Sequence, residues 1–254
     1  MSLLESQLGR LRGQTAWITG GKRIGRTVAR ALAEQGVNII ASFRRSAAEA
    51  RALVEQCQAC GVQSLAVEAD VTSRADFERA VEQARKRFPE IHILVSMASV
   101  YRPVAWEQIS ESDWQQNVAV HLLGSFWPAQ VLVPYMPAGS HIINVADACV
   151  TARMRKRVLP YQVTKAAVAA MTRAMAVELA PRGIFVNAIA PGPVLPPEDF
   201  PPERWDAIRA ASPLNYAVSD EEAVQQFALL VLYLSLTTGA TGHVFPLDMG
   251  ENLG

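Results

Sequence analysis

Three side chains in the middle of the chain have the types and spacing for acid–base chemistry. Tyr161 and Lys165 lie four residues apart in "PYQVTK", so a helix would place both on one face. Asp147, within "INVADACV" (143–150), ends the apolar run that precedes it and lies a short loop before them. An isolated tyrosine titrates near ~10 and a nearby ammonium favours the phenolate, so Lys165 is expected to lower the pKa of Tyr161. Asp147 is open to two interpretations, a catalytic carboxylate or a cap for the turn that follows.

A glycine-rich turn near the N-terminus has the pattern of a dinucleotide site. "WITGGKRIGRTVARAL" (17–32) reads as a strand, a turn and a helix. Gly20 and Gly21 permit positive φ and close backbone approach, and Gly25 lets the helix pack against the strand. The unpaired N–H groups at the helix start suit a pyrophosphate. The turn follows the first strand of an alternating pattern, which is the context such a site requires.

The end of the next strand indicates which dinucleotide is bound. An NAD site usually has an acid here for the ribose 2′-OH, whereas an NADP site has arginine. Arg44 and Arg45 occupy this place, and Ser46 is positioned to cap the following helix. Lys22 and Arg23 add positive charge in the first turn. We therefore expect NADPH/NADP as the cofactor; the alternative is a solvated basic corner.

These groups need a scaffold, and the chain alternates short apolar runs with longer amphipathic ones. The runs 15–19, 37–42, 63–69, 91–96, 141–146, 184–190 and 242–247 read as strands buried on both faces. The segments 24–35, 46–60, 74–88, 107–133, 161–180 and 220–235 read as helices. The alternation predicts a single-domain α/β fold, a doubly wound parallel β-sheet of Rossmann type with helices on both faces. The proline-rich stretch 190–205 is expected to be irregular through most of its length.

Composition excludes several classes of function. The chain has 254 residues, half of them hydrophobic, and its 24 Lys and Arg balance 24 Asp and Glu, so no charge field favours nucleic acid or a membrane surface. Its apolar stretches are broken well short of the ~20 residues that span a bilayer. Residues 1–13 carry Glu5 and lack the apolar block of a signal peptide, so a cytoplasmic protein is expected. Cys57 and Cys60 have no second pair to complete a zinc site, so no metal is expected.

Two further residues have alternative interpretations. Asp70, after the third strand, is placed either to contact the adenine amine or to cap the helix that begins near Arg74. Cys149 is adjacent to the acid–base group, but it has no base beside it that would make it a nucleophile.

Residues 14–250 resemble the short-chain dehydrogenase/reductase family through the glycine-rich turn, Tyr161, Lys165 and "VNAIAPGPV". The resemblance implies that Tyr161 is the general acid or base and that Lys165 lies beside the nicotinamide ribose. It implies cofactor contacts by Gly20, Lys22, Arg23, Ile24, Gly25, Arg44, Arg45, Ser46, Asp70, Val71, Ala98, Ser99, Tyr161, Lys165, Pro191, Gly192 and Val194.

Several positions depart from the common family pattern. "LVSMAS" (94–99) replaces an Asn-Asn-Ala-Gly run, His121 aligns with the usual active-site Asn, and Asp147 stands at the serine position. Together with "KRIG", "RRSAAEA" and "ASVYRP", these departures resemble the pteridine reductase and dihydromonapterin reductase branch. This resemblance implies substrate contacts by Arg23, Ser99, Tyr101, Asp147, Tyr161 and Pro193, with Tyr101 stacking on a pterin. His121 is either a proton relay or a buried core residue.

The expected function is NADPH-dependent hydride transfer to a dihydropterin or dihydrofolate-like ring, with Asp147, Tyr161 and Lys165 delivering the proton. A short-chain carbonyl reductase acting on a small ketone is the main alternative, and a non-catalytic NADP-binding sensor is the third. Residues 1–13 would form an N-terminal extension to a reductase domain of residues 14–254, with a substrate loop at about 190–212. The resemblance also implies a homotetramer or homodimer. The basic segment "ARMRKR" (152–157) is either a solvated loop or an anion site.

Overall fold

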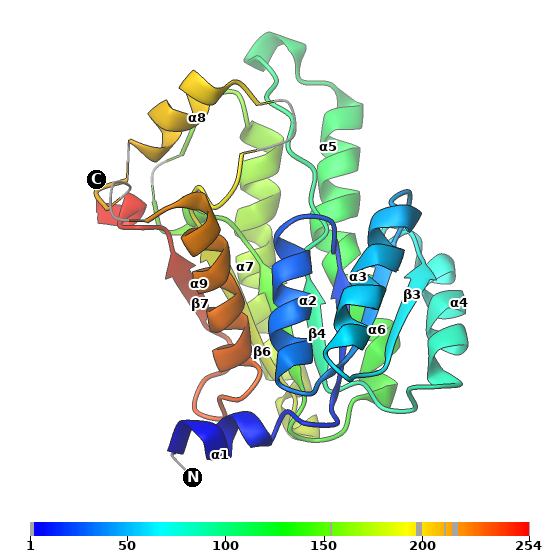
Figure 1. The fold of residues 1–254 in the computed structure, drawn as a ribbon. Coiled ribbons are helices and arrows are strands. Elements are labelled where there is room, and N and C mark those ends of the chain that lie inside the picture. Colours follow the sequence, from blue (N-terminus) through cyan, green and yellow to red (C-terminus); the bar gives the residue numbers. More distant parts are fainter. Residues whose placement is uncertain (1–2, 153, 197–199, 211, 215–217, 254) are drawn as a thin grey trace.

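Seven parallel strands form one sheet in the order β3-β2-β1-β4-β5-β6-β7 (Figure 1). The computed structural model describes residues 3–152, 154–196, 200–210, 212–214 and 218–253. The strands are β1 (Thr15–Thr19), β2 (Asn38–Phe43), β3 (Ser64–Glu68), β4 (Ile93–Ser96), β5 (His141–Val145), β6 (Phe185–Pro191) and β7 (Val244–Leu247). The helices are α1 (Leu3–Gly9), α2 (Ile24–Glu34), α3 (Ala47–Ala59), α4 (Arg74–Arg85), α5 (Glu111–Asn117), α6 (Gly124–Leu132), α7 (Leu159–Leu179), α8 (Pro202–Arg209) and α9 (Asp220–Leu234). The predicted doubly wound α/β fold is confirmed.

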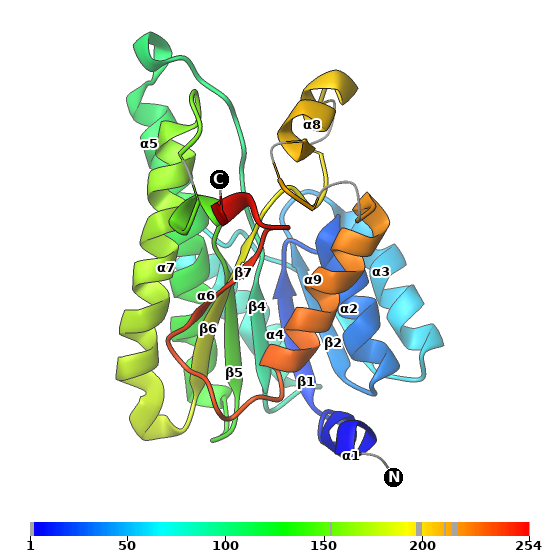
Figure 2. The same cartoon turned by 90° about the vertical axis from the view of Figure 1, so that its left-hand side faces the viewer.

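The sheet is buried on both faces, which explains the continuous apolar runs of its strands. Helices α2, α3 and α9 cover one face and α4 to α7 cover the other (Figure 2). Successive strand residues alternate between two cores: Ile18 packs with Val28 of α2 and Phe227 of α9, whereas Trp17 packs with Phe77 of α4. Both faces therefore need apolar side chains.

The predicted helix 107–133 is interrupted. Residues 106–108 form a 3₁₀ turn, and α5 begins only at Glu111 because Ser110 and Asp113 form a reciprocal capping box. After α5 the helix widens into a π-helical segment, Val118–Leu123, before α6 begins. This segment contains His121, and π-helical turns are frequent at functional sites.

Regular structure borders the proline-rich segment at both ends. Strand β6 extends to Pro191, and α8 runs from Pro202 to Arg209 with prolines at its start, where their missing N–H groups cost nothing. Residues 192–196 and 200–201, between these two elements, are irregular as predicted. Residues 197–199 and 211 of the proposed substrate loop lie outside the described residues.

The N-terminal residues pack on the domain. Leu11 is fully buried in the core beneath α2, and α1 precedes it. None of the described helices is long and apolar enough to cross a membrane. The carboxyl ends of the strands share one edge of the sheet; α8 lies beyond this edge and α1 beyond the opposite one (Figure 2). In open parallel sheets ligands bind at the carboxyl edge, so the functional site is expected there.

Candidate active site

Two adjoining cavities open at the carboxyl edge of the sheet. The first, of about 590 Å³, lies under α8, and the second, of about 480 Å³, lies over the ends of β2 and β3; both reach Gly20, Lys22 and Ser99. The first also holds Arg23, Ile24, Gly25, Tyr101, Asp147, Tyr161, Lys165, Pro191, Gly192, Pro193 and Val194. The second also holds Arg44, Arg45, Ser46, Asp70, Val71 and Ala98. Every site residue predicted from the sequence therefore lines one of the two cavities, except His121.

Asp147 is the centre of a hydrogen-bonded cluster. Its Oδ2 accepts the Tyr161 hydroxyl at 2.9 Å, and its Oδ1 accepts the Cys149 backbone N–H at 2.9 Å. Arg155 Nη2 bonds to both oxygens, at 2.7 and 3.0 Å. The capping interpretation of Asp147 is confirmed, because its side chain caps the 3₁₀ turn Ala148–Val150, and the same carboxylate contacts Tyr161. Three donor groups therefore contact the two oxygens, and one of them, Arg155 Nη2, is shared between both.

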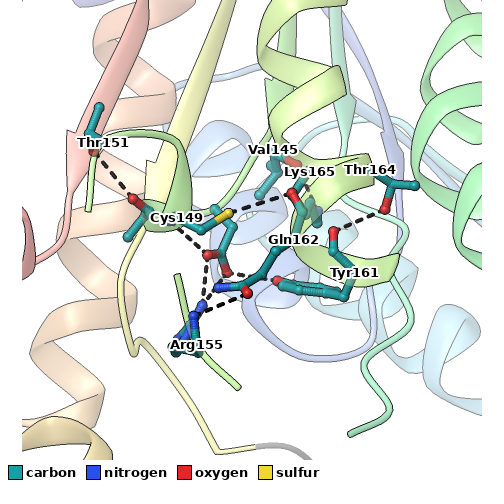
Figure 3. Close-up of polar contacts among 10 residues, drawn as sticks. Val145, Cys149, Thr151, Arg155, Tyr161, Gln162, Thr164 and Lys165 are labelled. Atoms are coloured by element: carbon teal, nitrogen blue, oxygen red, sulfur yellow. Dashed lines mark hydrogen bonds and ion pairs between the residues drawn. The ribbon is translucent and has the colours of Figure 1, made fainter. Parts of the chain in front are cut away.

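Lys165 and Tyr161 project from the first turns of α7 (Figure 3). The Lys165 ammonium donates to the Val145 carbonyl at 2.7 Å, and burial lowers the pKa of Lys165 to about 8. The pKa of Tyr161 is raised well above its ordinary value, first by burial and then by the charge and hydrogen bond of Asp147. The expected lowering of the Tyr161 pKa is therefore wrong for this structure, because burial, together with the adjacent acid, outweighs the cation of Arg155.

His121 is buried and bonded to backbone and side-chain groups. Its Nε2 accepts the Val100 N–H at 3.2 Å and lies 3.1 Å from Ser99 Oγ, so Nδ1 carries the proton towards Thr164 Oγ1 at 2.8 Å. Burial, followed by the charge of Lys165, lowers the pKa of His121 to about 3, so the ring is neutral. The ring contacts Tyr161 edge-on, with centroids 5.3 Å apart. Its placement links the π-helical segment to the loop after β4 and to α7.

The turn after β1 brings the backbone close to the end of β4. Gly20 has φ +75°, and a Cβ there would lie 2.8 Å from the Met97 carbonyl carbon. A Cβ on Gly25 would lie 2.8 Å from the Gly20 carbonyl oxygen. Gly21, in contrast, does not have a positive φ. Gly20 therefore leaves its backbone exposed to both cavities, as a bound pyrophosphate would require, and Gly25 lets α2 begin close to this turn.

The second cavity has a basic corner. Arg44 and Arg45 are exposed beside it, and Arg44 Nη1 lies 3.3 Å from Asp70 Oδ2. Lys22 Nζ lies 3.4 Å from Glu49, an acid of α3 that the sequence analysis did not single out. Ser46 occupies the N-cap position of α3, but its side chain makes no capping hydrogen bond.

Asp70 organises the loop after β3 and does not cap the next helix. Its Oδ1 accepts from the backbone N–H and the hydroxyl of Thr72, at 2.9 and 2.7 Å. Burial alone would raise the pKa of Asp70, but the Thr72 and Arg44 hydrogen bonds outweigh it and lower the pKa. Ser73 caps α4 instead, so the capping alternative for Asp70 is wrong.

Several cavity residues escaped the sequence-based prediction. Arg155 comes from the basic segment 152–157, and the pattern gives no sign that one of its cations turns inward. Phe200, Trp205 and Ile208 line the first cavity from the loop before α8 and from α8 itself. A helical reading of 202–209 would have placed Trp205 and Ile208 three residues apart, on one face.

Two of the three thiols are buried. Cys57 is buried in α3 and Cys60 is exposed at its end, and no cluster of metal ligands occurs among the described residues. Burial, reinforced by Asp147, raises the pKa of Cys149 to about 12, which makes its thiol a poor nucleophile at neutral pH.

Comparison with known proteins identifies the class. The short chain dehydrogenase family matches residues 14–200, so the chain belongs to this family of oxidoreductases. An uncharacterised oxidoreductase of Methylorubrum extorquens is 33% identical over 189 residues, covering 74% of this chain and 76% of the relative. A 3-oxoacyl-acyl-carrier-protein reductase FabG of Staphylococcus epidermidis is 34% identical over 182 residues, covering 70% and 74%.

Solved structures share the whole fold. FolM alternative dihydrofolate reductase 1 of Brucella canis, complexed with NADP, is 30% identical with a TM-score of 0.86 and covers 96% of each chain. A short-chain dehydrogenase of Burkholderia cenocepacia, also complexed with NADP, is 26% identical with a TM-score of 0.86, covering 96% of this chain and 99% of that one. A short-chain dehydrogenase/reductase of Serratia marcescens is 28% identical with a TM-score of 0.88, covering 95% and 99%.

Proposed function

We propose that this protein is an NADPH-dependent reductase that transfers a hydride to a dihydropterin or dihydrofolate-like ring. The observation that carries the proposal is the carboxylate of Asp147 in the first cavity, hydrogen-bonded to Tyr161 at 2.9 Å. An ionised carboxylate only accepts hydrogen bonds, and a ketone oxygen also only accepts them. A pterin ring offers N–H donors beside its reducible bond, so an acceptor at this position suits the ring better.

The residues around both cavities fit a bound NADPH. The Gly20 turn would lie against the pyrophosphate, since it has no room for a side chain, and Arg44 and Arg45 would meet the 2′-phosphate. Asp70 and Val71 would flank the adenine, and Lys165 the nicotinamide ribose. When bound, the cofactor supplies the hydride. The NADP in the FolM and Burkholderia structures supports this assignment.

Tyr161 would deliver the proton that accompanies the hydride. Its raised pKa keeps the phenol protonated across the neutral range, so it acts as an acid in the reductive direction. Asp147 orients the hydroxyl, and the fixed Lys165 ammonium places positive charge beneath the site.

Tyr101 would form one wall of the substrate pocket. Its ring meets Tyr161 edge-on with centroids 5.0 Å apart, and both side chains line the first cavity. Arg23, Ser99 and Pro193 line the same cavity and complete the proposed substrate contacts. The likeness to an alternative dihydrofolate reductase supports the choice of ring.

Consumption of NADPH with a panel of acceptors tests the proposal. Initial rates are measured with 7,8-dihydropterins and dihydrofolate, and in parallel with small ketones and a 3-oxoacyl thioester. We expect the dihydropterins to give the highest kcat/KM. Rapid turnover of ketones with none of the dihydropterins would reject the proposal.

A carbonyl reductase is the second candidate. The 34% identity to FabG favours it, as does Arg155, whose guanidinium adds hydrogen-bond donors to the first cavity that a carbonyl oxygen can use. The same panel of acceptors separates the two candidates.

Substitution of both Arg44 and Arg45 by alanine is expected to weaken NADPH binding by at least tenfold while leaving NADH binding unchanged. Charge-assisted hydrogen bonds contribute about 1.5–3 kcal/mol each, and only NADPH carries the 2′-phosphate they would bind. Dissociation constants are measured by cofactor fluorescence. Arg51→Ala, an exposed arginine of α3 outside the cavity, is the matched control. Equal losses for NADPH and NADH would contradict the assignment.

We also propose that the chain assembles as a homotetramer or homodimer. Large apolar side chains are exposed on α7, with Val177 75% accessible and Val163 43%, and on α9, with Leu229 and Tyr233 more than half accessible. A monomer in sedimentation velocity would contradict this. A cytoplasmic location and the boundary of the reductase domain at residue 14 stay proposals from the sequence.

A further inference from the structure

We propose that Arg155 is a positioning residue of the reaction site: its guanidinium holds the Asp147 carboxylate in the orientation that accepts the Tyr161 hydroxyl. The proposal rests on reduction taking place at Tyr161, but it holds whether the acceptor is a ring or a ketone. It assigns a role to a cation of the basic segment that lines the first cavity.

The geometry leaves the carboxylate little freedom. Arg155 Nη2 lies 2.7 Å from one oxygen of Asp147 and 3.0 Å from the other, and the Cys149 N–H holds the first oxygen from the opposite end of the turn. Rotating the carboxylate would break these bonds together with the one from Tyr161. The side chains of Arg155 and Asp147 are only 24% and 10% accessible, so water cannot readily replace a lost partner.

The segment that carries Arg155 is fastened to the helix that carries Tyr161. The Arg155 backbone N–H donates to Gln162 Oε1 at 3.1 Å, and Gln162 is a buried residue of α7 next to Tyr161 (Figure 3). At the end of the same segment, the Arg157 carbonyl accepts the Val104 N–H at 2.6 Å. The backbone from which the Arg155 side chain extends is therefore held in place relative to the Tyr161 hydroxyl.

A second carboxylate acts on the same guanidinium. Glu251, in the C-terminal 3₁₀ turn Glu251–Leu253, is 7% accessible. Burial alone would lower the pKa of Arg155, but the charges of Asp147 and Glu251 outweigh it and raise that pKa. The C-terminal turn thereby helps to keep a buried cation next to Asp147.

Arg155→Met in the full-length protein tests the positioning role. Methionine retains much of the apolar stem but cannot bond to Asp147. We expect kcat to fall by about 10²-fold, the scale of a displaced catalytic group, with NADPH affinity unchanged. Arg155→Lys should recover part of this loss, and guanidinium ion added at sub-denaturing concentration should partly rescue Arg155→Ala. Lys156→Met, at the exposed neighbouring position, is the control and should match the wild type.

Two results would overturn the proposal. The first is an unchanged kcat with a lower KM, which would mean that Arg155 only obstructs the pocket. The second comes from a double-mutant cycle of Asp147→Asn and Arg155→Met followed by thermal unfolding, which needs no substrate. If the two side chains interact, the double variant loses less stability than the sum of the losses in the two single variants. Additive losses of stability would reject the proposal.

The kinetic test is separable from the proposed function. It is run with whichever acceptor the wild type reduces fastest. A wild type that reduces ketones alone would therefore reject the pterin assignment and still allow the Arg155 proposal to pass or fail. If no acceptor in the panel is reduced, the double-mutant cycle decides.

Discussion

Tyr161→Phe is expected to lower turnover by roughly 10²–10⁴-fold, the range contributed by a positioned acid. The substitution removes the hydroxyl that donates to Asp147 and retains the ring that packs against Tyr101 and His121. Because Arg155 and Cys149 continue to bond to Asp147, the carboxylate keeps partners and the melting temperature should change little. The effect should therefore appear in kcat and not in the folded fraction.

The measurement is single-turnover reduction with saturating NADPH, alongside thermal unfolding. Tyr101→Phe is the matched control, because it removes a hydroxyl from the neighbouring ring in the same cavity and should keep most of the activity. Turnover by Tyr161→Phe equal to that of Tyr101→Phe would show that another group supplies the proton.

The second large effect is expected at Asp147. Asp147→Ala and Asp147→Asn should each reduce kcat by about 10²-fold, since the Tyr161 hydroxyl loses its ionic acceptor. NADPH affinity should be nearly unchanged, because Asp147 lies in the first cavity, away from the basic corner formed by Arg44 and Arg45. The asparagine variant preserves the shape of the side chain and so separates loss of charge from loss of packing.

Asp113→Asn provides the control for burial of an acid. Asp113 is also buried, accepts a hydroxyl from Ser110 at 2.6 Å and pairs with Arg102 at 3.1 Å, but it lines neither cavity. Its variant should lose stability through the capping box and retain turnover. If both aspartate variants lost activity in proportion to their stability, Asp147 would be a structural residue. Dihydropterin turnover by Asp147→Ala equal to the wild type would likewise exclude a catalytic role.

The fold could be predicted because the relevant signals are local. Ile18 and Trp17 are adjacent and serve opposite cores, so both had to be apolar, and this shows directly as a continuous run. Gly20 could be singled out because its conformation and its contact with Met97 exclude a side chain. The alternation of such strands with amphipathic helices then fixes the parallel sheet and its carboxyl edge.

The features that escaped prediction depend on tertiary contacts. Arg155 looks like any other cation of a basic loop until Gln162 and Asp147 fix its direction. The sequence places Lys165 near Tyr161, but the pKa of Tyr161 rises because burial and Asp147 outweigh the cation of Arg155, and that balance exists only in the folded site. Sequence spacing can therefore indicate which side chains lie together, but it does not give the direction in which their pKa values shift.

The ratio of kcat/KM for a dihydropterin to kcat/KM for a ketone, compared between the wild type and Asp147→Ser, tests the central claim most directly. The substitution replaces a carboxylate, which only accepts hydrogen bonds, with a hydroxyl, which can also donate one to a carbonyl oxygen. The account predicts a wild type that favours the dihydropterin and a serine variant whose ratio shifts towards the ketone. A wild type that favours the ketone, with a ratio unaffected by the substitution, would contradict it.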